Sequence, residues 1–280
     1  MAVLLGVLVA LSFGTADFVG GRATARSSVM GTLVVSQVCA FTGAVLLVLV
    51  TDADLTAHDI VLGAWAGVAT IFGIGLLYYG LAHYAVGVVA PIAAVTGAVV
   101  PVTWGLIQGE RPSVLAIFGV VLAISAGALI ARERDESHSG GTRGVTVAVL
   151  AGATLGASLV LFAETNPDSG MWPVLSARAV AGLLVWLGAL LLLARHRPVA
   201  MTHDRDVRLA IAAGTLDVGA TALLVLAVRR GLIVVVAPIA SLAPGFTVLL
   251  AWAVLGERLG SVQRVGVVCA LVGVLLVSTG

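Results

Sequence analysis

Long apolar blocks fill most of the chain and are separated by short polar or Pro/Gly-containing segments. Each block matches the roughly 20 residues that a helix needs to cross about 30 Å of hydrocarbon. Membrane-spanning strands would alternate polar and apolar residues, whereas a helix satisfies its own backbone hydrogen bonds in lipid. The pattern therefore predicts an all-α integral membrane protein with ten transmembrane helices. We expect them at residues 2–21, 31–51, 60–82, 85–107, 113–131, 144–163, 171–193, 208–228, 232–254 and 261–279.

A polar linker, residues 132–143, separates the fifth predicted helix from the sixth. It divides the chain into a first five-helix unit at residues 1–131 and a second at residues 144–280. The other connections are mostly short and leave no room for an appended soluble domain. We therefore expect the function to reside among the helices.

The two units share sequence. A shift of 147 residues aligns Val88–Ala123 with Val235–Ala270 without a gap and gives 13 identities in 36 positions. The matches include Val-Val-Ala-Pro-Ile-Ala, beginning at residues 88 and 235, and Gly-Glu-Arg, beginning at residues 109 and 256. We interpret the chain as a tandem duplication. Because each unit crosses the membrane an odd number of times, the second enters upside down, which predicts the inverted repeat typical of transporters.

Composition narrows the class of protein. The chain is 60% hydrophobic and 10% charged, whereas a soluble domain carries about 25% charged residues. This excludes soluble enzyme folds and nucleic-acid binders, and the net charge of +1 argues against a polyanionic partner. Cys39 and Cys269 both lie in apolar blocks, so we expect small buried side chains, with no disulfide framework, metal or cofactor. The first apolar stretch is interpreted as a retained span and not as a cleaved signal.

The repeat and its motifs together resemble the EamA-type transporters of the drug/metabolite transporter superfamily. Each five-helix unit has Ala-Pro-Ile near the start of its fourth helix and Gly-Glu-Arg at the turn into its fifth. The resemblance covers essentially the whole chain and implies a ten-helix carrier of small solutes with a central cavity between the repeats. It also implies alternating access and multi-pass insertion in the plasma (inner) membrane. Phe13 stands where the family often has Trp.

Charged residues inside the predicted spans are candidate functional residues, because a charge at a helix centre raises the free energy of membrane insertion by about 2.5–3.5 kcal/mol. Asp217 lies in the middle of the eighth helix, and Asp17 lies late in the first, on the face of Phe13. Arg178 lies within the seventh helix. In one interpretation an aspartate binds a proton or a cationic group, with Arg178 as counter-ion or as binder of a substrate carboxylate. In the other, an acid pairs with Arg178 only to make both charges tolerable.

Other candidates have a structural alternative beside the functional one. Tyr78, Tyr79 and His83 at the end of the third helix either line a cavity mouth or anchor at the headgroups, and the anchor is favoured. Paired prolines in the fourth and ninth helices are hinges or static kinks: Pro91, Pro101, Pro238 and Pro244. The Gly-Glu-Arg turns are expected to be structural, with capping or local pairing: Gly109, Glu110, Arg111, Gly256, Glu257 and Arg258.

These observations predict a secondary transporter of a small organic metabolite or drug, with export favoured and proton coupling left open. No Gly-x-x-x-x-Gly-Lys-Ser/Thr motif occurs, so the energy must come from an ion gradient or from the substrate. The alternatives are an uncoupled facilitator or exchanger and, in a different class, a membrane assembly protein without transport activity. An intramembrane enzyme is not expected, because no catalytic constellation is present. Expected partners are the substrate and the lipid bilayer, with the chain as monomer or homodimer.

Arginine placement and the resemblance disagree on orientation. Eleven arginines fall on the side that would hold both termini and three on the other side, so the positive-inside rule puts the termini outside the cytoplasm. The resemblance implies cytoplasmic termini. Both orientations remain open.

Overall fold

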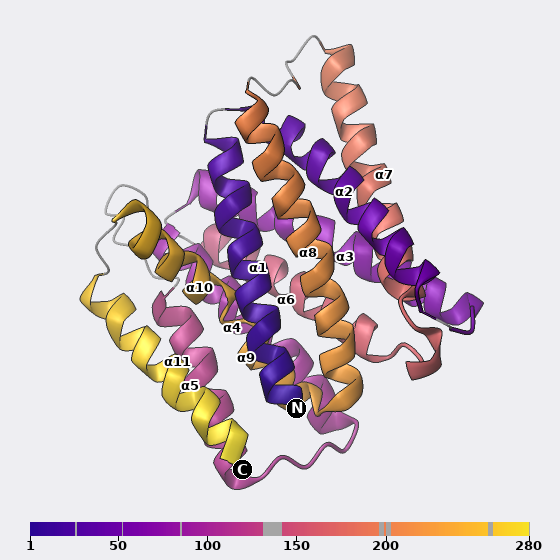
Figure 1. Ribbon diagram of the computed structural model, residues 1–280. Helices are drawn as coiled ribbons and strands as arrows, with labels where there is room; N and C mark the ends of the chain where they lie inside the picture. The colour runs from indigo at the N-terminus through magenta and orange to yellow at the C-terminus, as the bar shows by residue number, and fades with distance from the viewer. Residues whose placement is uncertain are drawn as a thin grey trace.

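The computed structural model describes residues 1–25, 27–51, 53–84, 86–130, 142–195, 199, 203–256 and 260–279. Within these residues the chain is helical and contains no strand (Figure 1). The first half consists of α1 (Ala2–Thr24), α2 (Val29–Leu49), α3 (Ala57–His83), α4 (Val86–Ile107) and α5 (Val114–Ile130). The second half consists of α6 (Thr142–Ala163), η1 (Pro167–Ser169), α7 (Trp172–Ala194), α8 (Asp204–Arg230), α9 (Ile233–Ala240), α10 (Ala243–Leu250), η2 (Ala251–Leu255) and α11 (Ser261–Thr279).

The helices have the lengths and surfaces of membrane spans. In the described part of the chain nine helical spans are long and apolar enough to cross a bilayer, and α5, with 17 residues, is a further apolar helix. Their outer faces carry large exposed apolar side chains, such as Phe118 on α5 and Leu190 on α7, which suit contact with hydrocarbon. The predicted all-helical, multi-pass membrane architecture is confirmed. Both chain ends lie at the same end of the molecule (Figure 1).

The ninth span is divided into three short segments. A break at Ser241 and Leu242 separates α9 from α10, and Pro244 occupies the first turn of α10, where its missing N–H is not needed. The span ends in the π-helical turn η2. In the fourth span, by contrast, α4 runs continuously through Pro91 and Pro101. Each proline there removes a backbone donor without ending the helix, and the hinge role of the four prolines stays a prediction.

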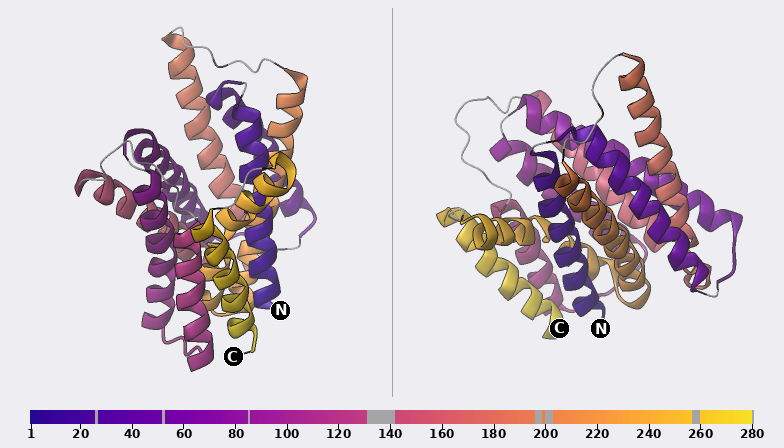
Figure 2. Two further views of the ribbon diagram at one scale, coloured as in Figure 1. Left: turned by 90° about the vertical axis from the view of Figure 1, so that its left-hand side faces the viewer. Right: turned by 45° about the horizontal axis from the view of Figure 1, so that its top comes forward.

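The two halves interleave and do not form separate bundles (Figures 1 and 2). Helix α1 packs along α8 and against α9 and α10 of the second half, while α6 packs along α3 and α4 of the first half. Similarly, α2 contacts α8 and α3 contacts α7. Three further pairs join corresponding helices: α2 with α7, α4 with α9, and α5 with α11. The contacts of α1 with α8, α9 and α10 thus have counterparts in those of α6 with α3 and α4, as the contact of α2 with α8 has in that of α3 with α7, and the core lies between the halves.

Glycines set the closest helix approaches. Gly67 on α3 faces the backbone of Ala177 on α7, and a Cβ added to Gly67 would lie 2.9 Å from the Ala177 Cα. Gly214 on α8 faces the backbone of Ser36 on α2, and its Cβ would lie 2.8 Å from the Ser36 Cα. These two glycines are separated by the same 147 residues as the sequence repeat. Small residues at such contacts let backbones approach where lipid provides no hydrophobic driving force.

We predict opposite effects for two glycine-to-alanine changes on α8. Gly214→Ala would push against the α2 backbone and lower the thermal unfolding midpoint in detergent micelles, because that backbone cannot move without shifting its helix. In Gly219→Ala the added Cβ has no neighbouring atom within 4 Å. This change should leave the midpoint the same or raise it, because alanine is about 1 kcal/mol more favourable than glycine inside a helix. Equal midpoints for the two variants would contradict the packing described here.

Candidate functional site

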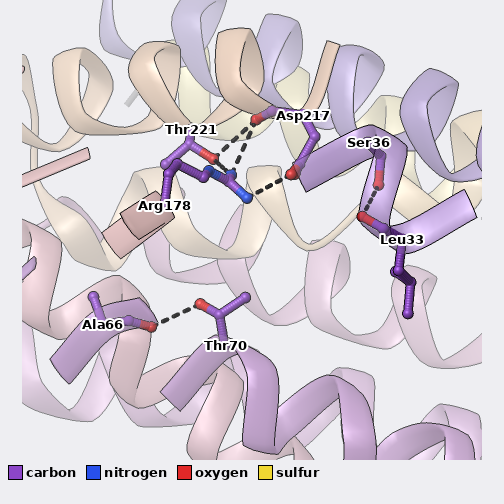
Figure 3. Close-up of polar contacts among 7 residues, drawn as sticks. All are labelled: Leu33, Ser36, Ala66, Thr70, Arg178, Asp217 and Thr221. Carbon is purple, nitrogen blue, oxygen red and sulfur yellow. Dashed lines mark hydrogen bonds and ion pairs between the residues drawn. The ribbon is translucent and has the colours of Figure 1, made fainter. Parts of the chain in front are cut away.

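Arg178 of α7 and Asp217 of α8 form a charged pair inside the bundle (Figure 3). Arg178 Nη1 donates to Asp217 Oδ2 at 2.5 Å, and Nη2 donates to the Asp217 carbonyl oxygen at 3.3 Å. Nη2 also donates to Thr221 Oγ1, one turn along α8. Thr221 Oγ1 in turn donates to the Asp217 carbonyl at 2.9 Å. A pairing of Arg178 with an acid was among the sequence interpretations, and in the structure its partner is Asp217.

The two charges of the pair differ in accessibility. The Arg178 side chain is 8% exposed, whereas the Asp217 side chain is 30% exposed. Arg178 Nε has no hydrogen-bond partner among the described residues. The Asp217 carboxylate is therefore the member of the pair that a small solute or water can reach. The buried Arg178 guanidinium fixes its position through the hydrogen bond to Oδ2.

Asp17 of α1 points into the bundle. It lies nine residues after Leu8, or two and a half helical turns, and so on the face opposite that exposed side chain. Neighbouring glycines on either side of it pack inward, Gly14 against α10 and Gly20 toward Ala213 of α8. Asp17 is nevertheless exposed and has no hydrogen bond or ion pair within the described ranges. Asp17 is thus an exposed acid on the inward face of α1.

Asp17, Asp217 and Tyr78 lie near one another. The Asp17 carboxylate is close enough to Asp217 for coulombic interaction, and Tyr78 of α3 is within coulombic range of both acids. Tyr78 is 54% exposed. Phe13, one turn before Asp17, packs against the apolar core formed by both halves. The structure thus brings together residues from α1, α3, α7 and α8 that the sequence singled out separately.

Tyr79 and His83 form a local pair instead. Their rings stack with centroids 4.3 Å apart, and His83 Nδ1 lies 2.9 Å from the Tyr79 carbonyl oxygen one turn earlier. Both contacts lie within the last turns of α3 and the Tyr79 side chain is exposed. These contacts suit the anchoring role that the sequence favoured, which stays a prediction.

A separate apolar hollow of about 220 Å³ lies between α4 and α5. It is lined by Pro91, Ile92, Val95, Thr96 and Ala128. No charged side chain lines it, so it is not part of the site around Asp217. Among the described residues no group of three or more His, Cys, Asp or Glu side chains is placed to hold a metal ion.

The Gly-Glu-Arg turn of the first half reaches across to the second. Gly109 has a φ of +89° and ends α4, and Gly256 has a φ of +72° after η2, so both turns use the left-handed conformation that glycine favours. Glu110 then accepts from the backbone N–H groups of Ile233 and Val234, each at 2.9 Å. Local pairing was expected, and the contact found is distant in sequence. Glu257 and Arg258 lie outside the described residues.

Two charged residues that the sequence did not single out build a polar cluster at the same end of the bundle. Asp59, fully buried at the start of α3, accepts from the Asn166 N–H at 2.8 Å. Arg229, near the end of α8, donates to the Gly170 carbonyl at 2.7 Å and to Ser169 Oγ at 2.9 Å. The spacing of Thr56 and Asp59, typical of a helix N-terminus, was the available signal.

Glu164, directly after α6, also makes a specific contact. Its Oε1 accepts from Trp104 Nε1 of α4 at 2.7 Å. This bond joins the end of α6 to α4, and therefore links the two halves.

Comparison with known proteins identifies the family. The model of the EamA-like transporter family matches residues 142–279. The chain belongs to the EamA-like transporter family. It is therefore a membrane transporter of the drug/metabolite type, as the motifs of both halves had indicated.

Further similarities cover a half and the whole of this EamA-like chain. An uncharacterized protein of Methanocaldococcus jannaschii is 30% identical over 136 residues, which are 48% of this chain and 93% of that protein. A crystal structure of another protein superposes over 99% of this chain and 96% of its own, with a TM-score of 0.77 at 14% identity. The second similarity shows a shared fold.

We predict strong coupling between Arg178 and Asp217 in this EamA-like transporter. Asp217→Asn leaves the buried Arg178 guanidinium without its counter-ion and should cost about 3–5 kcal/mol of stability, whereas Arg178→Gln leaves the partly exposed Asp217 carboxylate and should cost less. The double variant removes both charges and should lose clearly less than the sum of the two. Thermal unfolding in detergent micelles measures all three. Thr215→Val, on an exposed face of α8, is the matched control and should change little; additive losses would contradict the pairing.

Proposed function

We propose that this EamA-like protein is a secondary transporter that exports a small organic solute across the plasma (inner) membrane by alternating access. The solute would occupy a central cavity between two inverted halves, bordered by α1, α3, α7 and α8. The observation that carries the proposal is the accessible, unpaired carboxylate of Asp17 beside the Arg178–Asp217 pair. Charged groups at membrane depth that face a bundle interior mark transport pathways.

The exchanged helix contacts support two inverted halves. Helix α1 packs on α8 as α6 packs on α3, and the close approaches at Gly67 and Gly214 occur at repeat-related positions. The archaeal relative matches about half of this chain over almost its whole length. A protein of that size supports a five-helix unit as the repeating element. Rocking of one half against the other around a fixed site is the motion that such repeats favour.

The net charge of Asp17, Asp217 and Arg178 gives a physical reason why transport would be coupled to binding of a proton or a cationic group. When ionised, Asp17 and Asp217 carry two negative charges against the one positive charge of Arg178, which leaves the site at −1. A proton or a monovalent cationic group at Asp17 would neutralise this charge. The loaded site would then be cheaper to enclose in a low-dielectric interior than the empty one. Proton coupling and recognition of a cationic group both follow from this difference.

Flux measurements in reconstituted vesicles test the proposal. Labelled amino acids, sugars and cationic dyes would be supplied as a mixed pool, with and without an imposed pH gradient. We expect the wild type to move one solute in response to the gradient, and Asp17→Asn to abolish that response because the neutral side chain no longer gains from a bound cation. Asp217→Asn should also reduce flux. Asp54→Asn, an acid-to-amide change at an exposed position outside the spans, is the matched control.

Different outcomes separate the alternatives. Equal flux in wild type, Asp17→Asn and Asp217→Asn at every pH would favour an uncoupled facilitator or exchanger. Absence of flux for every solute, from protein whose unfolding transition is intact, would contradict the proposal and favour an assembly role.

A further inference from the structure

The contact between Glu110 and the start of α9 has no role in the solute site. Both carboxylate oxygens are used, Oε1 by the Ile233 N–H and Oε2 by the Val234 N–H, each at 2.9 Å. The turn that carries Glu110 lies at the end of the molecule where both chain ends are found (Figure 1). A side chain of the first half therefore caps a helix of the second half.

The cap satisfies donors that have no other partner. The first N–H groups of a helix lack intrahelical acceptors, and the partial positive charge at that end favours an anion. Ile233 and Val234 are 4% and 2% exposed, so water does not replace the carboxylate there. Within the described residues the one other side chain from outside α9 that hydrogen-bonds to it is that of Ser241, the residue directly after the helix, which donates to the Pro238 carbonyl at 2.7 Å. Glu110 is thus the polar tie that holds this helix in place.

Gly105 makes the space that Glu110 occupies. A Cβ on Gly105 would lie 2.6 Å from Glu110 Oε2 and 2.6 Å from Ile233 Cγ2. In the aligned sequence of the second half the corresponding residue is Trp252. The glycine that leaves room for the carboxylate in the first half is therefore replaced by a large aromatic residue in the second.

Helix α9 is a short segment set apart from the rest of its span. It has eight residues and is followed by the break at Ser241 and Leu242. The Glu110 bonds join the α4–α5 turn to this short segment across the boundary between the halves. Any rotation of one half against the other at this end must stretch or break them.

We propose that Glu110 is the gating residue at this end of the transporter. Its carboxylate holds α9 against the α4–α5 turn while the cavity is closed here, and it releases the helix when this end opens. The inference rests on the proposed alternating access. Glu110 is a positioning residue, because it acts through α9 and does not touch the solute.

Thiol labelling in lipid nanodiscs tests the gate. A reporter, Val236→Cys, is placed on the fully buried side of α9 in a background where the free cysteines are replaced, Cys39→Ala and Cys269→Ala. We expect Glu110→Ala to raise the rate of labelling by a membrane-impermeant maleimide about tenfold, as a shift of about 1.4 kcal/mol in the open population gives. Gly105→Ala should do the same by displacing the carboxylate.

Two controls separate gating from other effects. Arg111→Gln changes the charge of the adjacent residue, which has no hydrogen bond or ion pair among the described residues, and should leave labelling unchanged. A reporter at Ala148→Cys, fully buried on α6, should stay unlabelled in every variant. Labelling of Val236→Cys at the wild-type rate in both Glu110→Ala and Gly105→Ala would overturn the gate.

If Glu110→Ala exposes both reporters, the protein has unfolded, and Glu110→Asp decides the outcome. Faster labelling at position 236 alone supports the gate, and an unchanged rate overturns it. Solute flux is measured on the same variants in vesicles. If the Glu110 variants show wild-type solute flux and an unchanged labelling rate at position 236, only the gating role of Glu110 is contradicted. If labelling changes but no variant, including the wild type, moves solute, the proposed transport function is contradicted.

Discussion

Close approach of helix backbones at glycines is the constraint on which the rest of the structure depends. Lipid gives apolar helices no reason to associate, so van der Waals contact between backbones must do it. The contacts at Gly67 and Gly214 also position the charges. Ala177, which faces Gly67, precedes Arg178, and Gly214 lies one turn before Asp217. Because both approaches are tight, α7 and α8 present their opposite charges at hydrogen-bonding distance. A bulkier residue at either glycine would separate helices and charges together.

Polar side chains within the bundle fall into two groups. Hydroxyl groups largely satisfy themselves, as Thr70 does by donating to the Ala66 carbonyl and Ser36 by donating to that of Leu33 (Figure 3). Such bonds use the helix's own acceptors and leave no polarity for a solute. Asp17 has no such option, because a carboxylate needs a donor and a helix interior offers none. The contrast explains why chemistry concentrates at a few charged residues in a chain with many polar ones.

The hydropathy of the sequence was sufficient to predict the membrane spans, because each span needs a long apolar block regardless of the helices it packs against. The pairing of Arg178 with an acid was also predictable, since an unpaired charge in lipid is too costly. The contacts of Glu110 were not, because they join residues far apart in the chain and need the space left by Gly105. The division of the ninth span, which was expected as one helix at residues 232–254, was not predictable for a related reason. Proline removes one donor, and whether the helix then breaks depends on neighbouring packing that the sequence does not display.

The interleaving of the halves has a consequence for biogenesis. Helix α1 leaves the ribosome long before the helices that cover it, α8, α9 and α10. Throughout synthesis its inward face, with Asp17, must therefore rest against lipid or against transient neighbours. The late helices complete the bundle only by inserting between segments already in the membrane. Assembly of this protein is a post-insertion event with long-range contacts, and neither half cut from the chain would have its packing surfaces covered.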